Sequence, residues 1–336
     1  NDLILLIATM TTINIPTTDG IIWNKNQVIL DIAHHMAIDK NIAIALIGEG
    51  PCCNELGLYD ILEKSCNTFN YDITRITIFT ANALETHPSI TIKYNFPMHL
   101  VMDALNEYSD IRVTKNLSKY FGIFVGKSNP ARLHLSSYLY HVYSDLTMQI
   151  YRYNKDDDYY RNNIGLELLI KNYKLDVVDE SLFLLECPIL LESASEIKYV
   201  KNTALNLSQH LDKSNKISKY YDSFFVELVC ESYYSCNTVF PTEKIWRPML
   251  LKTPFIVQGP LHYLRNLHEL GFKTFDNWWD EEYDTDPDLG RLQTIKNNID
   301  WIAEQDVPTI EQWYREMEEI LAHNHNRVKY LMAKHT

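Results

Sequence analysis

The sequence predicts an α/β protein with two domains, each built on a largely parallel β-sheet. Its 336 residues are about twice the length of a typical domain. The hydrophobic share of 46% is ordinary for a globular protein, so two cores can be buried. Short apolar runs alternate with amphipathic stretches, a pattern typical of strands joined by helices in parallel sheets.

The first domain is predicted over residues 1–117. Its strands are expected at four apolar runs, residues 3–9, 41–47, 76–81 and 90–96. Its helices are expected at 26–38 and 54–64. In the first of these helices, Val28, Ile32 and Met36 recur at the spacing of one helical face.

The second domain is predicted over residues 118–289, beginning with a strand at 120–125 and a helix from Pro130 to Tyr143. A clearer unit follows, with a strand at 224–229, a helix at 242–251, a strand at 254–259 and a helix at 261–270. This order is half of a Rossmann-like domain. Residues 290–336 form an amphipathic helical tail that is expected to pack back on the domains.

The charge balance excludes several classes of protein. The chain carries 31 Lys and Arg against 44 Asp and Glu, a net charge of -13, which disfavours binding to a nucleic-acid backbone. Residues 276–288 alone hold seven carboxylates and no Lys or Arg.

No apolar run is long enough to span a membrane. The six cysteines form no CxxC pair, which favours reduced thiols in a cytoplasm.

The sequence begins with Asn1 rather than Met, so a processed chain or a piece of a longer protein remains open.

Ligands of parallel sheets bind outside the carboxyl ends of the strands, here the loops at 48–55, 126–132 and 230–244. The residues Gly126-Lys127-Ser128 imitate a nucleotide-binding P-loop. Only three residues separate Gly122 from Gly126, however, whereas the P-loop needs four between its glycines. No GxGxxG motif occurs, which disfavours a glycine-dependent dinucleotide site.

Two predicted helix starts could hold phosphate groups. At the first, Ser128 and Asn129 precede a helix whose first turn carries Arg132. Free N–H groups at a helix start and a guanidinium suit a phosphate. The alternative for this segment is a capped helix with an Arg on its surface.

At the second start, Thr242 is the expected N-cap, followed by Glu243 and Lys244. Lys244 could bind a diphosphate, Glu243 could accept hydrogen bonds from sugar hydroxyls, and Phe240 could lie against a nucleobase. The alternative is an ordinary capped helix with an acid in its first turn. A lysine in the first turn is unfavourable with respect to the helix dipole, however, which indicates that Lys244 has a role other than stabilising the helix.

These segments resemble the α-1,3-fucosyltransferases of glycosyltransferase family 10. The segment TEKIW at 242–246, followed by the apolar PFIVQGP at 254–260, is similar to the Thr-Glu-Lys-Leu-Trp signature of that family. Ser128, Asn129 and Arg132 match its upstream Ser-Asn and Arg. The stretch at 264–284 is similar to fucosyltransferase-like proteins of bacteria and large viruses.

The resemblance implies a GT-B fold of two facing Rossmann-like domains. It also implies GDP-fucose bound in the C-terminal half, a glycan acceptor in the N-terminal half, inversion at the anomeric carbon, and no metal or other cofactor. Leaving GDP would be stabilised by Arg132 and Lys244. Glu49, which follows the 41–47 strand, would be the general base. Lys127 and Arg247 are expected close to the phosphates.

The sequence departs from the family at donor-binding positions. Glu231-Ser232 stands where the family has Glu-Asn-Ser, and Phe240 replaces a Tyr. Glu231 is nonetheless expected to bind the donor. Two alternatives therefore stay open: a transferase that uses another nucleotide sugar, and a glycan-binding module that keeps the fold without activity.

Overall fold

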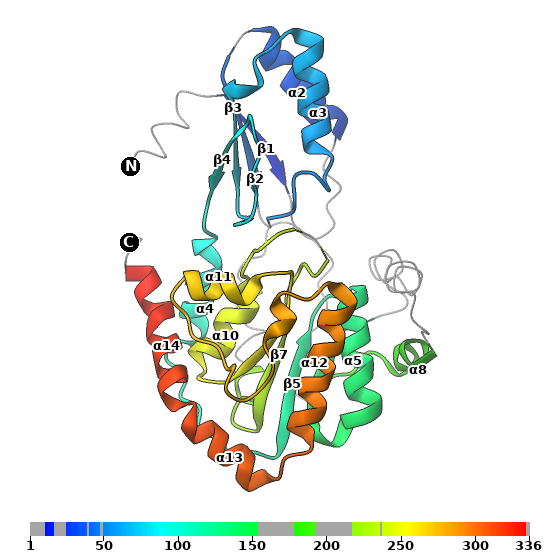
Figure 1. Cartoon of the computed structure of the whole chain (residues 1–336), viewed down its shortest axis with the longest axis vertical. Coiled ribbons are helices and arrows are strands. Elements are labelled where there is room, and N and C mark those ends of the chain that lie inside the picture. The colour runs from blue at the N-terminus through cyan, green and yellow to red at the C-terminus, as the bar shows by residue number, and fades with distance from the viewer. Residues whose placement is uncertain are drawn as a thin grey trace. The chain divides into compact units, whose positions relative to one another are not determined.

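The computed structural model describes residues 11–16, 25–38, 40–47, 50–153, 178–191, 217–235 and 237–333. The chain forms two compact units, the first of residues 1–97 with 235–240 and the second of residues 98–234 with 241–336. Each unit contains a parallel four-stranded sheet (Figure 1). The predicted α/β class with parallel sheets is therefore confirmed.

The first unit has the sheet order β1-β2-β3-β4, with all neighbouring strands parallel. The strands are β1 (Thr11–Pro16), β2 (Ile42–Ile47), β3 (Ile76–Thr80) and β4 (Thr91–Tyr94). The helices α2 (Lys25–Ala37) and α3 (Leu58–Phe69) pack beside one another, and a 3₁₀ turn, η1, spans Ile73–Arg75. Ile13, Ile44 and Ile78 of the strands and Ile32 and Leu62 of the helices share one buried cluster.

The second unit has the sheet order β6-β5-β7-β8, again with parallel neighbours. The strands are β5 (Lys119–Val125), β6 (Thr147–Tyr151), β7 (Phe224–Cys230) and β8 (Phe255–Gln258). All seven residues of β7 are buried, as expected for a central strand covered on both faces. Gly122 of β5 permits the close approach of β7, because a Cβ there would lie 2.7 Å from the ring of Phe224.

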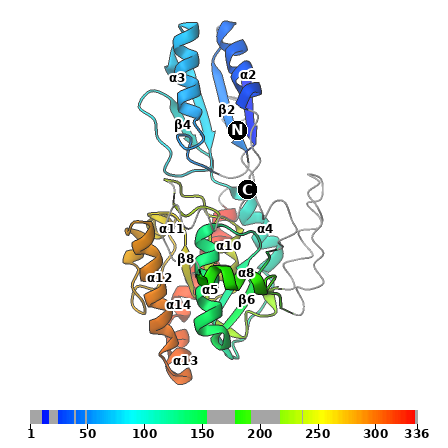
Figure 2. The same cartoon turned by 90° about the vertical axis from the view of Figure 1, so that its right-hand side faces the viewer.

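Helices cover both faces of this second sheet (Figures 1 and 2). On one side, α4 (Met98–Tyr108), α10 (Glu243–Leu250) and α14 (Glu318–Ala333) pack together. On the other side, α5 (Pro130–Tyr143) packs against α8 (Val178–Glu186) and α12 (Asp288–Ala303). The remaining elements are α11 (Tyr263–Glu269), α13 (Val307–Glu316) and the 3₁₀ turns η2 (Ser144–Leu146) and η4 (Glu282–Asp284).

The division of the chain differs from the predicted domain boundaries. Residues 98–117 belong to the second unit, because α4 packs against α10 and α14. The helices α12 to α14, which include the tail predicted from residue 290 to pack back on the domains, belong to this unit. None of the helices in the described part of the chain is both long and apolar enough to cross a membrane.

Several elements were not predicted. The strand β1 lies at 11–16, whereas the predicted strand at 3–9 falls outside the described residues. The elements α4, β6 and α8 are additional, and α3 begins at Leu58 rather than at residue 54. Most of the polar stretch at 197–219 also falls outside the described residues.

Residues 235–240 follow β7 in sequence but belong to the first unit. Thr238 donates its hydroxyl to the carbonyl group of Gly50. The side chain of Asn82 accepts from the backbone N–H of Val239 at 3.0 Å, and Val239 in turn accepts from the N–H of Ala83 at 2.9 Å. The segment is thus fixed to the loops that follow β2 and β3.

Candidate functional site

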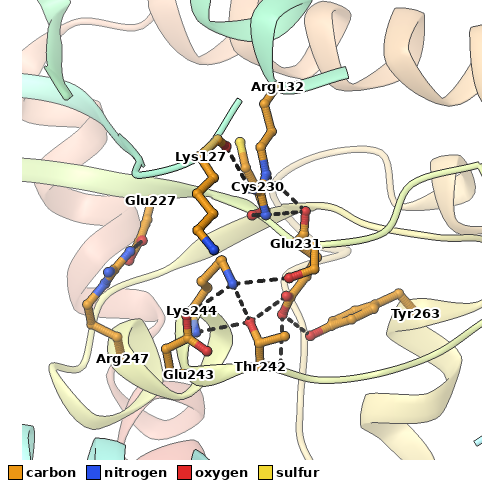
Figure 3. Close-up of polar contacts among 11 residues, drawn as sticks. Lys127, Arg132, Glu227, Cys230, Glu231, Thr242, Glu243, Lys244, Arg247 and Tyr263 are labelled. Atoms are coloured by element: carbon orange, nitrogen blue, oxygen red, sulfur yellow. Dashed lines mark hydrogen bonds and ion pairs between the residues drawn. The ribbon is translucent and has the colours of Figure 1, made fainter. Parts of the chain in front are cut away.

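Three basic side chains meet where β5 and β7 end. These strands are neighbours, so the loops that follow them lie side by side at the carboxyl edge of the sheet. The helices α5 and α10 begin from these loops. Lys127 and Arg132 come from the first loop and helix and Lys244 from the second, and the side chain of Lys127 points toward Lys244 (Figure 3). We call these three residues the cationic cluster.

Arg132 is a framework residue of this site. Its side chain is buried, and the guanidinium donates to three backbone carbonyl groups. Nη1 donates to Lys127 at 2.7 Å and Nη2 to Cys230 at 3.0 Å, while Nε and Nη2 donate to Glu231 at 3.1 and 2.6 Å. Arg132 therefore ties the end of β7 to the loop after β5. Its positive charge still contributes to the electrostatic potential of the cluster.

We expect Arg132→Lys to lower the free energy of unfolding by about 1–3 kcal/mol, because a single ammonium group cannot satisfy all three buried carbonyl groups. Urea denaturation of the variant and of Arg265→Lys, a control at an exposed arginine of α11, measures this difference. Equal loss in both variants would contradict the framework role of Arg132.

Glu231 and Thr242 form the start of α10. The buried carboxylate of Glu231 accepts from the hydroxyl of Thr242 at 2.6 Å, from the Thr242 N–H at 3.3 Å and from the Tyr263 hydroxyl at 2.5 Å. Thr242 caps the helix as predicted, since its Oγ1 accepts from the N–H of Lys244 at 3.3 Å. Glu231 therefore positions the helix start, and its carboxylate accepts three hydrogen bonds within the protein.

Lys244 is a partly exposed member of the cationic cluster. Its side chain is 20% exposed, and Nζ donates to Thr242 Oγ1 at 3.0 Å, to Glu243 Oε1 at 3.0 Å and to Ser232 Oγ at 3.4 Å. The side chain of Glu243 is 50% exposed, so its carboxylate remains open to a ligand. These contacts use the three N–H donors of the ammonium group, so an added anion would replace one of them, and the long contact with Ser232 is the weakest.

The pKa of Lys127 is lowered by its surroundings in the cluster. Burial, and then the positive charges of Lys244 and Arg132, lower the pKa of Lys127 to about 8, whereas Glu243 acts in the opposite direction. A lysine whose pKa is lowered by its cationic neighbours lies in a positive potential. A bound anion would relieve that potential, so this edge of the sheet is suited to anion binding.

The other predicted residues of the first loop have structural contacts. The hydroxyl of Ser128 is buried and hydrogen-bonded to that of Tyr151. Asn129 is the N-cap of α5, with Oδ1 accepting from the Arg132 N–H at 2.9 Å, and Pro130 stands in the first turn as predicted. These two residues shape the loop that presents Lys127.

Two predicted residues lie outside the described part of the second unit. Phe240 is buried within the segment that belongs to the first unit. Glu49 lies outside the described residues.

Arg247 is engaged in a buried network. It forms an ion pair with Glu227 of β7, and its Nε donates to the hydroxyl of Tyr221 at 2.5 Å. The Tyr221 hydroxyl in turn donates to Glu227. This network anchors α10 to the sheet, and Figure 3 shows Arg247 beside Glu227.

Glu227 and Tyr263 were missed by the sequence reasoning. An acidic residue in the middle of the apolar strand FFVELVC could have indicated a buried ion pair. Tyr263 gave no comparable signal, because a tyrosine in an amphipathic helix is ordinary.

No group of three or more His, Cys, Asp or Glu able to hold a metal ion occurs among the residues that the structure describes. In the same part of the chain, Cys52, Cys53, Cys66, Cys187 and Cys230 are free thiols.

Comparisons with known proteins identify no relative. No protein-family model matches the chain, and neither a curated protein nor a solved structure matches it.

Proposed function

We propose that the protein is an inverting glycosyltransferase of GT-B architecture that transfers fucose from GDP-fucose to a hydroxyl group of a glycan. The observation that carries the proposal is the cationic cluster at the starts of α5 and α10, in which burial and neighbouring cations lower the pKa of Lys127 to about 8. The leaving group of such a reaction is a nucleoside diphosphate, whose developing negative charge requires fixed positive charge.

The residues take different roles in this proposal. Lys244 and Lys127 bind the diphosphate, and the N–H groups at the two helix starts add their dipoles. The exposed carboxylate of Glu243 accepts hydrogen bonds from hydroxyl groups of the donor sugar. Arg132, Glu231 and Thr242 hold the two loops in place through the contacts described above. Glu49 keeps the role of general base as a prediction from the sequence.

Thermal unfolding with a panel of nucleotide sugars tests the proposal. GDP-fucose and GDP should raise the melting temperature, and GDP-fucose with a glycan acceptor should yield GDP. A response to UDP-sugars instead would favour a transferase with a different donor. No response across the panel would favour the glycan-binding module.

The binding of GDP should weaken as the pH rises through about 8, the value to which the pKa of Lys127 is lowered in the free protein. The diphosphate favours the charged ammonium, so binding raises this pKa and takes up a proton. Deprotonation of Lys127 should then reduce the affinity by up to about tenfold per pH unit.

Calorimetry between about pH 7 and 9.5 measures this dependence, in a range where the terminal phosphate of GDP is already ionised. Lys127→Arg should flatten the profile, because a guanidinium stays charged throughout. The same slope in the variant would show that another group titrates.

A further inference from the structure

A cavity of about 680 Å³ lies within the second unit, at the opposite end of α10 from the cationic cluster. The loop after α4, the end of α10 and the second half of α14 form its walls. Its volume is within the range of cavities that bind small molecules in proteins. No residue of the cationic cluster lines it, so it is a separate site.

Basic side chains from three segments line this cavity. Arg112 belongs to the loop after α4, Lys252 follows α10, and His325 and Lys329 lie on α14. Within the described part of the chain, the side chains of Arg112, Lys252 and Lys329 form no hydrogen bond or ion pair. Asp110 is the one carboxylate in the lining. Such a concentration of unpaired positive charge is unexpected in a chain with a net charge of -13.

The backbone of Lys252 has an uncommon conformation for a lysine. This residue adopts a left-handed conformation with φ of 49°, which follows the end of α10. Glycine or asparagine is the usual choice at such a position, because other side chains are strained there. In this conformation Lys252 is part of the cavity lining.

The positive charges of Lys252 and Lys329 also affect the pKa of His325. Its Nδ1 donates to the carbonyl group of Leu250 at 2.9 Å, which caps the end of α10. Burial lowers the pKa of His325, and Lys329 and Lys252 lower it further against the effect of the Leu250 carbonyl group. The negative end of the α10 dipole favours the positive charge of Lys252. It does not account for Arg112 and Lys329, which belong to other segments.

We propose that this cavity binds a small phosphate monoester, such as a sugar phosphate. The guanidinium of Arg112 can hold two phosphate oxygens, and the ammonium groups of Lys252 and Lys329 supply the remaining charge. Ile111, Val113 and the end of α10 also line the cavity, whose volume of about 680 Å³ is larger than a phosphate group alone requires. The proposal does not depend on the function proposed above, because the two sites share no residues.

Calorimetry of the full chain with inorganic phosphate and with glucose 1-phosphate tests this site. The double variant Arg112→Gln/Lys329→Gln should weaken the binding of both probes by about 100-fold, since each charged hydrogen-bonding partner is worth at least about tenfold. Both substituted residues are exposed, so unfolding is expected to be unchanged. The control Arg265→Gln, at an exposed arginine of α11, should bind as the unmodified protein does.

A second comparison separates the cavity from the cationic cluster. Lys244→Ala should retain glucose 1-phosphate binding at the cavity. Unchanged binding in Arg112→Gln/Lys329→Gln, or its loss in Lys244→Ala alone, would overturn the proposal, as would the absence of binding of both probes.

The phosphate group could belong to a soluble metabolite or to a lipid. Sedimentation with vesicles that contain phosphatidic acid distinguishes these sources. We expect the protein to remain in the supernatant while it binds glucose 1-phosphate. Sedimentation that the double variant abolishes would support the phosphate site and assign it to a lipid headgroup.

Discussion

Lys244→Ala should lower kcat/KM for fucosyl transfer from GDP-fucose by about 100- to 1,000-fold, the effect of removing one preorganised group that stabilises a developing anion. Lys244 is suited to this role because its ammonium group is part of the cationic cluster and remains partly exposed. A radiolabelled transfer assay with saturating acceptor measures the loss. The affinity for GDP should fall as well, since the product carries the same diphosphate.

Lys273→Ala is the matched control for this substitution. Lys273 is an exposed lysine of the same unit that lies outside both proposed sites, so its replacement should leave transfer unchanged. Because Thr242 is held by Glu231 independently of Lys244, the melting temperature of Lys244→Ala should stay close to that of the unmodified protein. Full activity in a folded Lys244→Ala protein would refute the assignment of the donor site.

Arg247→Met should lower the free energy of unfolding by about 3–5 kcal/mol, the cost of leaving a buried charge without its partner. The side chain of Glu227 is 1% exposed, and in the variant its carboxylate retains only the hydrogen bond from Tyr221 among the contacts described. Urea denaturation followed by tryptophan fluorescence measures the change.

Arg315→Met provides the reference for Arg247→Met. This arginine of α13 is 67% exposed and lies 3.9 Å from Glu311, so its loss should change stability by no more than about 0.5 kcal/mol. Adding Glu227→Gln to Arg247→Met should recover part of the loss, because it removes the unpaired charge. If Arg247→Met and Arg315→Met were equally stable, the buried ion pair of Arg247 with Glu227 would have no net effect on stability.

The fold was predictable where the hydrophobic pattern was local and strong. The runs at 42–47, 76–80 and 224–230 are strands, and the helix start at Pro130 follows from the fixed φ of proline. The strand β1 was missed because its inward residues Ile13 and Ile15 alternate with polar ones, whereas residues 3–7 form a stronger apolar run.

The sequence predicted those contacts of the site that join residues close together in the chain. The caps Asn129 and Thr242 were evident because each bonds to a backbone N–H within three residues. The role of Arg132 was not evident, since the carbonyl groups of Cys230 and Glu231 that it binds lie 98 and 99 residues away in sequence. Because β5 pairs with β7, these carbonyl groups lie beside Arg132. That pairing is not visible in the sequence, so the sequence alone did not indicate these contacts.

The segment 235–240 has a consequence for the order in which the chain folds. Thr238, Val239 and Phe240 are buried with the first unit, although they are synthesised long after residue 97. The last segment of the first unit is therefore synthesised only after residues 98–234, which belong to the second unit. A fragment cut at residue 97 would lack this segment, and the complementary fragment would carry it without its partners Gly50 and Asn82. Neither fragment is expected to behave as an autonomous domain.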